Sequence, residues 1–183
     1  MNLQILRRSY DRFASGYDEA FQAQQTPKIV SLLAALPDPP PTPWLDVGAG
    51  TGLVARLSGG APICLDLSRG MVARAPAPRV QADLHALPFP AGALRCVTAV
   101  TALIDLSTPA TALAELVRVL APGGWLAVTA LVRENPEAFA AALRRLPLTP
   151  FVRLSLGNDV GFVARRLPLR DGERPAVTGD PPV

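Results

Sequence analysis

Nine residues constrain the fold of this chain more than any other stretch. Trp44 to Gly52 reads WLDVGAGTG, a short apolar strand followed by a loop that carries glycine at every second position. Such loops favour ligand sites at the carboxyl ends of buried strands, because glycine adopts positive φ angles and lets a ligand approach the backbone. The dinucleotide-binding pattern GxGxxG requires a third glycine at position 53, where this chain has Leu53. A Walker phosphate loop is excluded as well, because no Gly-Lys-Ser/Thr sequence occurs.

The rest of the chain alternates apolar strands with helical segments. Strands are predicted at 44–47, 62–66, 79–82, 95–101 and 125–132, and helices at 51–58, 68–75, 109–120 and 135–146. This alternation predicts an α/β fold, with a mostly parallel sheet covered by helices on both faces. Two further strands at 151–156 and 160–167 are separated only by Gly157-Asn-Asp, which predicts an antiparallel hairpin.

The length and the apolar pattern predict one domain preceded by a helical segment. A chain of 183 residues has room for a single sizeable core. Residues 1–36 keep a three-to-four apolar spacing and are expected to be helical. A proline-rich linker over 37–43 then leads into an α/β domain over 44–169. Residues 170–183 have no apolar pattern, which predicts a flexible tail.

Composition argues against several classes of function. The net charge is only +3, and the basic residues are scattered arginines with Lys28 as the one lysine, so no nucleic-acid surface is indicated. No stretch approaches the roughly 18 apolar residues of a membrane span, and no apolar segment follows Arg7-Arg8 as it does in a signal peptide. We therefore expect a cytoplasmic location. Cys64 and Cys96 stand apart in predicted strands, which favours inert buried thiols over metal or redox chemistry.

Three predicted strands carry an aspartate at their carboxyl ends: Asp46, Asp66 and Asp83. Each one alone fits a solvated strand end or a helix cap, but three together at one sheet edge indicate a ligand site. A pyrophosphate beside Asp46 would be repelled at a cost of about 1 kcal/mol or more, because no Lys or Arg lies within residues 46–55. An ammonium and a sulfonium would be attracted, and S-adenosylmethionine carries both groups. The acids therefore predict this cationic cofactor.

Five motifs identify a family that the chain resembles. They are YDRFASGYD (10–18), LDVGAGTG (45–52), CLDLSRGMV (64–72), ADLHALPFP (82–90) and LAELVRVLAPGGWLAV (113–128). Together they resemble the class I S-adenosylmethionine-dependent methyltransferases, in the type 11 group that includes ubiquinone and menaquinone biosynthesis enzymes. The resemblance covers about residues 9–130. It implies a Rossmann-like sheet of seven strands in the order 3-2-1-4-5-7-6, with strand 7 antiparallel, which fits the predicted hairpin.

The resemblance also assigns roles to individual residues. It implies that Gly48, Ala49, Gly50 and Gly52 pack against the methionyl part of the cofactor, with Asp46 facing the ammonium through water. Asp66 would hold the ribose. The remaining implied contacts are Leu67 and Met71 on the adenine face, Asp83 and Leu84 at its polar edge, Thr101 beside the methyl-bearing sulfur, and Tyr17 in an N-terminal helical lid.

The acceptor side departs from the family pattern. After the fourth strand the family often has His-His, where this chain has Ile104 and Asp105. Asp105 is the candidate general base for a protonated acceptor, although an aspartate there can simply precede the next helix. His85 is expected to have a surface role, and Tyr10 to pack on a helix face or bound the acceptor pocket. The leading hypothesis is methyl transfer to a small-molecule acceptor. The alternative is a non-catalytic cofactor-binding homologue that acts as a regulatory or partner subunit, and a homodimer could supply a missing lid.

Overall fold

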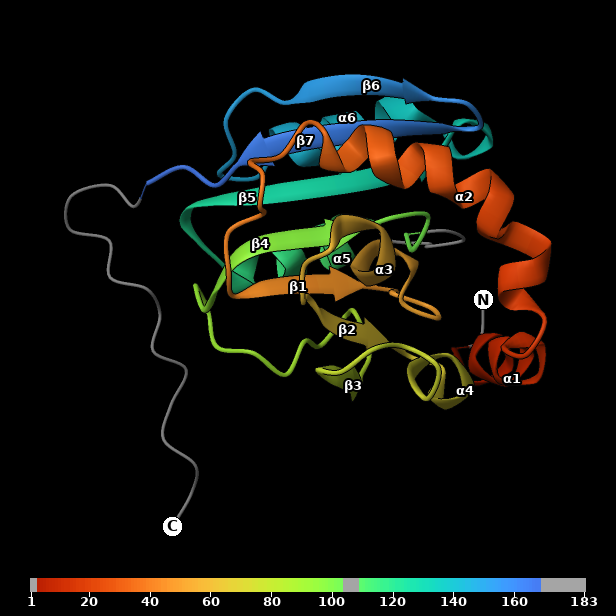
Figure 1. The fold of residues 1–183 in the computed structure, drawn as a ribbon. Coiled ribbons are helices and arrows are strands. Elements are labelled where there is room, and N and C mark those ends of the chain that lie inside the picture. The colour runs from red at the N-terminus through yellow and green to blue at the C-terminus, as the bar shows by residue number, and fades with distance from the viewer. Residues whose placement is uncertain (1–2, 104–108, 169–183) are drawn as a thin grey trace, which may run out of the picture.

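The computed structural model describes residues 3–103 and 109–168. A seven-stranded sheet forms the centre of the molecule, in the order β3-β2-β1-β4-β5-β7-β6 (Figure 1). The strands are β1 (Trp44–Val47), β2 (Ile63–Asp66), β3 (Arg79–Gln81), β4 (Leu94–Ala99), β5 (Leu120–Leu131), β6 (Val152–Leu156) and β7 (Asp159–Arg165). Neighbouring strands from β3 to β5 pair in parallel, and β7 pairs antiparallel with both β5 and β6. The predicted fold class and strand order are confirmed.

Helices cover both faces of this sheet. They are α1 (Leu3–Phe13), α2 (Tyr17–Leu33), α3 (Leu53–Ser58), α4 (Arg69–Val72), α5 (Pro109–Val119) and α6 (Pro136–Arg144), with a short 3-10 turn η1 (Val132–Glu134) before α6. Helices α2 and α3 pack on one face, around buried Ile29, Leu32 and Leu53. Helices α5 and α6 pack on the other, in the larger apolar core with Leu116 and Phe139. This two-sided burial explains why the central strands are apolar almost throughout.

Helix α1 lies apart from these two layers. It contains no buried residue and sits beyond the carboxyl ends of β1 and β2, against α4 (Figure 1). The sequence predicted helical structure over residues 1–36, and the structure divides the described part of this segment into two helices, α1 ending at Phe13 and α2 beginning at Tyr17. Gly16 precedes α2, and its backbone N–H donates to the carbonyl of Phe13 at 3.1 Å, which closes the turn. This break lets α1 turn across the end of the sheet.

Most elements begin or end one to three residues from their predicted bounds, and two also differ in their strand pairing. Strand β5 begins at Leu120, which pairs with Leu94, before a register shift brings Trp125 opposite Cys96. The Pro-Gly-Gly segment after α5 therefore forms a bulge within β5. In the hairpin the turn contains only two residues, because Asp159 pairs with Leu156 as the first residue of β7. Asp159 is fully buried, although the sequence placed it in the turn.

Both cysteines lie buried in strands without a disulfide, as expected. Burial raises the pKa of Cys64 to about 11 and that of Cys96 to about 12, so both thiols stay protonated at neutral pH. Within the described ranges, no helix is both long and apolar enough to cross a membrane. The tail predicted over 170–183 and the candidate base Asp105 fall outside the described residues.

Candidate functional site

The glycine loop after β1 folds as its sequence predicts, but its glycines serve different purposes. Gly48, Gly50 and Gly52 all have positive φ angles, of 67°, 56° and 84°. A Cβ atom on Gly48 would lie 2.3 Å from Cβ of Ala102, and one on Gly52 would lie 2.4 Å from Cδ of Pro76. These two glycines are therefore required by packing within the protein. A Cβ on Gly50 would meet nothing nearer than 3.8 Å, so its backbone is the accessible part of the loop.

Asp66 joins the glycine loop to the end of β2. Its Oδ2 accepts a hydrogen bond from the backbone N–H of Gly50 at 2.9 Å, and its Oδ1 accepts one from the N–H of Ser68 at 2.8 Å. Burial raises the pKa of Asp66, while these two hydrogen bonds partly oppose the shift. The carboxylate is thus held rigidly at the point where β1 and β2 both end.

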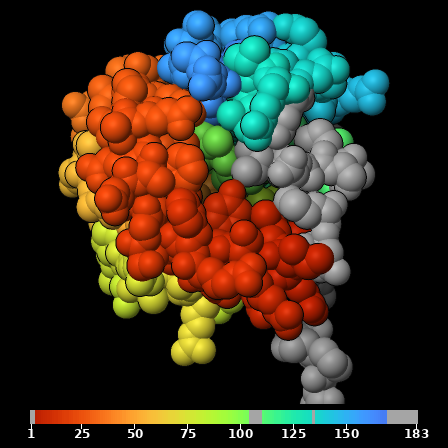
Figure 2. Space-filling view, turned by 90° about the vertical axis from the view of Figure 1, so that its right-hand side faces the viewer, coloured from red at the N-terminus to blue at the C-terminus, as the bar shows by residue number. Residues whose placement is uncertain are grey.

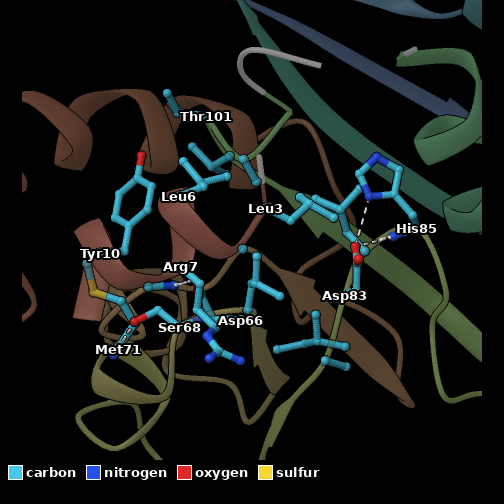
Figure 3. Close-up of a pocket in the computed structure, with 18 of the residues that line it drawn as sticks. Leu3, Leu6, Arg7, Tyr10, Asp66, Ser68, Met71, Asp83, His85 and Thr101 are labelled. Carbon is cyan, nitrogen blue, oxygen red and sulfur yellow. Dashed lines mark hydrogen bonds and ion pairs between the residues drawn. The ribbon is translucent and has the colours of Figure 1, made fainter. Parts of the chain in front are cut away.

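A first cavity of about 100 Å³ opens beside this carboxylate (Figure 3). Side chains from the carboxyl ends of the strands form one wall, and helix α1 forms another. In Figure 3, Asp83 and His85 lie together at one end of the cavity, and Tyr10 and Thr101 lie toward the other. Most of the predicted cofactor residues line this cavity: Tyr17, Gly48, Gly50, Asp66, Leu67, Met71, Asp83, Leu84 and Thr101.

Asp83 and His85 form a pair within the first cavity. Asp83 Oδ1 accepts a hydrogen bond from the backbone N–H of His85 at 2.9 Å and lies 2.8 Å from His85 Nδ1. Asp83 follows β3 by two residues, because the strand ends at Gln81. His85 was expected to have a surface role, but the structure places it in the cavity lining beside the predicted adenine-edge residues.

Asp46 occupies a different position from the one predicted. It lies inside β1, which continues through Val47, and its side chain is only 1% exposed. Thr98 donates a hydrogen bond to Asp46 Oδ1 at 2.7 Å, whereas Asp46 Oδ2 has no hydrogen-bond partner among the described residues. Burial raises the pKa of Asp46 to about 7, with the hydrogen bond from Thr98 opposing the shift and the charge of Asp66 adding to it.

A small adjoining cavity of about 40 Å³ contacts this buried acid. Its lining includes Asp46, Ala49 and Gly50, together with Tyr17. Asp46 therefore does not stand at the mouth of the first cavity but behind the glycine loop. Gly52 is absent from the residues that line either cavity, because it is packed against Ala75 and Pro76.

Helix α1 supplies site residues that the sequence analysis missed. Leu3, Leu6 and Arg7 line the first cavity alongside Tyr10 (Figure 3). Asp11 fixes this helix in place, because its Oδ1 accepts hydrogen bonds from Ser68 Oγ at 2.7 Å and from the backbone N–H of Gly70 at 2.9 Å. The motif YDRFASGYD contains Asp11 and so carried a signal for this contact, but the sequence does not reveal its partner.

A second cavity, of about 760 Å³, lies on the other side of Tyr10, Tyr17 and Thr101, which line both cavities. Figure 2 shows the hollow between the red α1–α2 segment and the blue β6–β7 hairpin, with green atoms visible at its base. Four aromatic rings from α1 and α2 contact one another along one wall, with centroid distances from 5.1 to 6.4 Å. The second cavity is lined by Ser9, Tyr10, Phe13, Tyr17, Phe21, Gln24, Gln25, Lys28, Thr101, Leu131, Val132, Arg133, Gly157 and Asn158.

Comparison with known protein sequences finds similarity to methyltransferases. Residues 45–128 match a family described as a methyltransferase domain. The malonyl-[acyl-carrier protein] O-methyltransferase of Dechloromonas aromatica is 38% identical over 133 residues, which cover 69% of this chain and 50% of that protein. The protein of the same name from Geobacter sulfurreducens is 34% identical over 161 residues, covering 78% and 60% of the two chains. The chain thus spans about half the length of the curated relatives it matches.

Solved structures share the fold at low sequence identity. An S-adenosylmethionine-dependent methyltransferase from Thermotoga maritima superposes with a TM-score of 0.73 at 17% identity, covering 86% of this chain and 98% of that one. A methyltransferase solved in complex with the Haloferax volcanii Trm112 methyltransferase activator gives a TM-score of 0.78 at 17% identity, with 90% and 98% coverage. These likenesses concern the fold alone.

Proposed function

This chain belongs to the class I S-adenosylmethionine-dependent methyltransferases, and from that premise we propose that it methylates a small-molecule acceptor bound in the second cavity. The observation that carries the proposal is the wall between the two cavities. Tyr10, Tyr17 and Thr101 line both of them, so a ligand in the first cavity and a ligand in the second would meet there. A volume of about 760 Å³ also falls in the range typical of pockets for small ligands.

The residues around the first cavity fit the cofactor of this family. Asp66 offers a fixed carboxylate that suits the two hydroxyl groups of a ribose, and a ligand can approach Gly50 closely on the side where other residues carry Cβ. The buried Asp46 Oδ2, which accepts no hydrogen bond from a described residue, suits a water or an ammonium behind the loop. We assign Leu67, Met71, Asp83 and Leu84 to the adenine. When bound, S-adenosylmethionine supplies a methyl group that its sulfonium has already activated.

The protein's own contribution is positioning and exclusion of water. Methyl transfer is an in-line displacement, so much of the acceleration comes from holding the acceptor atom on the line of attack. Residues 1–36 act as the lid in this proposal: α1 lies across the first cavity, and the aromatic rings of α1 and α2 wall the second. Residues 44–169 form the methyltransferase domain proper.

The lining of the second cavity suggests which acceptors to test. Its apolar wall suits an aliphatic or aromatic body, and Arg133 adds a cationic side chain to the lining, whereas the charge of Lys28 is balanced by Asp159. Relatives of this chain are named malonyl-[acyl-carrier protein] O-methyltransferases. Carboxylic acids with an apolar body are therefore the first acceptors to examine, since a carboxylate is already deprotonated at neutral pH and requires no general base.

The test is a methyl-transfer assay on the full chain. Purified protein is incubated with methyl-labelled S-adenosylmethionine and a panel of carboxylic acids, phenols, amines and thiols, and labelled product is identified by mass spectrometry. The proposal predicts one methylated class of acceptor with stoichiometric formation of the demethylated cofactor. Cofactor binding without product across the panel would instead support the alternative, a cofactor-binding subunit without turnover.

A further inference from the structure

Asp159, the first residue of β7, is fully buried and sits at the centre of a polar network. Its Oδ1 lies 2.5 Å from Nζ of Lys28, a residue of α2 that is 5% exposed. Its Oδ2 accepts hydrogen bonds from the hydroxyl of Thr101 at 2.8 Å and from the hydroxyl of Thr129 at 2.9 Å. One carboxylate thus connects α2, β5 and the segment after β4, which are far apart in the sequence.

Thr101 is held by this network in an unfavourable backbone conformation. Its φ angle is 51°, a left-handed value that a β-branched residue rarely adopts because it strains the backbone. The backbone N–H of Thr101 donates to Oγ1 of Thr129 at 2.7 Å, and that hydroxyl in turn donates to Asp159. With the bond from the Thr101 hydroxyl to Asp159, the three residues close a ring. Because the ring holds both the N–H and the side chain of Thr101, it opposes relaxation of the strained backbone.

The strained residue is also the one that the two cavities share. Thr101 lines both of them, and Lys28 and Gln25 of α2 line the second. Oε1 of Gln25 lies 3.3 Å from Oγ1 of Thr101, which adds a further contact between α2 and this wall. The network therefore couples the wall between the two cavities to helix α2. This helix begins at Tyr17, which also lines both cavities.

We propose that Asp159 is a positioning residue that, through Thr129, holds Thr101 at the wall between the two cavities. It touches neither cofactor nor acceptor in this account, and its effect passes through Thr101. The inference rests on the proposed function only in taking the first cavity as the cofactor site. Its test consequently uses cofactor binding and amide exchange, and requires no knowledge of the acceptor.

The test changes the link to Thr101 while leaving the buried ion pair intact. Thr129→Val removes the hydroxyl that accepts from the Thr101 N–H, and Thr129→Ser restores a hydroxyl at the same place. Thr111→Val serves as a matched control, because Thr111 is exposed on α5 and is absent from the lining of both cavities. For each full-length variant, calorimetry gives the Kd for S-adenosylmethionine, thermal unfolding gives the Tm, and hydrogen exchange reports on the amide of Thr101.

We expect Thr129→Val to accelerate exchange at Thr101 and to weaken cofactor binding by about three- to tenfold, the effect of one lost hydrogen bond. Thr129→Ser should bind within about twofold of the wild type, as should Thr111→Val. Asp159→Asn should show the same two changes together with a lower Tm, since it leaves Lys28 without its counter-charge.

Two outcomes would overturn the inference. One is a Thr129→Val protein that binds the cofactor as the wild type does and protects Thr101 equally well. The other is a Thr129→Ser protein that is as impaired as Thr129→Val, which would assign the effect to packing. If the wild type itself fails to bind S-adenosylmethionine, the proposed function fails, and that result is distinct from both.

Discussion

The carboxylate of Asp66 accepts a hydrogen bond from the backbone N–H of Gly50 at 2.9 Å. This contact joins the end of β2 to the glycine loop after β1, so the residue assigned to the ribose also shapes the loop assigned to the methionyl part. The ribose part and the methionyl part of the predicted cofactor site are therefore structurally coupled through this hydrogen bond. A substitution of Asp66 should therefore disturb both the ribose contact and the glycine loop.

Replacing Asp66 tests this coupling between the end of β2 and the glycine loop directly. Asp66→Ala removes the charged acceptor for the ribose and releases the Gly50 N–H, so cofactor binding should weaken by roughly 1–3 kcal/mol. Calorimetric titration with S-adenosylmethionine measures the change. Asp38→Ala, at an exposed position in the proline-rich linker, is the matched control and should bind as the wild type does. An unchanged Kd in Asp66→Ala would remove Asp66 from the site.

Asp46 predicts a pH dependence of stability. Its pKa of about 7 in the folded protein exceeds the ordinary value of 3.8, so between these pH values the folded state holds a proton that the unfolded state has lost. The free energy of unfolding of the cofactor-free protein should therefore fall as pH rises from about 4 to about 7, by up to a few kcal/mol. Asp46→Asn removes this contribution.

The Asp46→Asn protein should accordingly unfold at a higher Tm than the wild type at pH 8, with the difference shrinking toward pH 5. Its affinity for S-adenosylmethionine should be lower at pH 8, because the ammonium loses a negative partner. Differential scanning calorimetry and binding titrations at the two pH values measure both effects. A variant less stable than the wild type at pH 8 would contradict the raised pKa.

The hydrogen bonds of Asp11 to Ser68 and Gly70 should determine how firmly α1 is held over the first cavity. Hydrogen bonds from the Gly70 N–H and the Ser68 hydroxyl lower the pKa of Asp11, so the contact persists at neutral pH and weakens only as pH falls through that lowered pKa. Asp11→Ala should increase the dissociation rate of the bound cofactor by about three- to tenfold. Stopped-flow displacement measures the rate, with exposed Glu19→Ala as the control. Equal rates in the two variants would show that α1 does not act as a lid.

Replacing Gly48 should lower the stability of the folded protein. Gly48→Ala must keep a φ angle near 67° and place Cβ within 2.3 Å of Cβ of Ala102, so the free energy of unfolding should fall by about 1–3 kcal/mol or more. Gly16→Ala is the natural comparison, because a Cβ there meets nothing within 4 Å and φ is negative. Urea denaturation of the two variants should separate them clearly. Similar midpoints would mean that the loop accommodates a side chain.

The sequence predicted the sheet well because its strands are apolar on both faces and separated by turn residues. It could not place α1, since an exposed helix leaves the same amphipathic pattern whether it lies on the core or across a cavity. Asp159 was misplaced for a related reason. A Gly-Asn-Asp run is typical of turns, and only the pairing of Asp159 with Leu156 shows that the acid lies within a strand.

Part of the candidate site could be predicted from the sequence, because the ends of parallel strands lie along one edge of the sheet. Residues at or just after strand ends, such as Asp66 and Leu67, converge in any parallel sheet, so their shared cavity follows from spacing alone. Burial does not follow from spacing: Asp46 lies behind the loop with one oxygen that has no hydrogen-bond partner in the described part of the chain, and Lys28 pairs with a residue 131 positions away. Such contacts depend on tertiary packing that a single sequence does not express.

The most direct measurement is a calorimetric titration of the wild-type chain at pH 8 with three ligands: S-adenosylmethionine, its demethylated product and NADH. A site framed by Asp46, Asp66 and Asp83 should bind the first two, whose amino-acid part carries an ammonium, and give no binding heat with the pyrophosphate-containing NADH. Tight binding of NADH without a response to the other two would contradict the account.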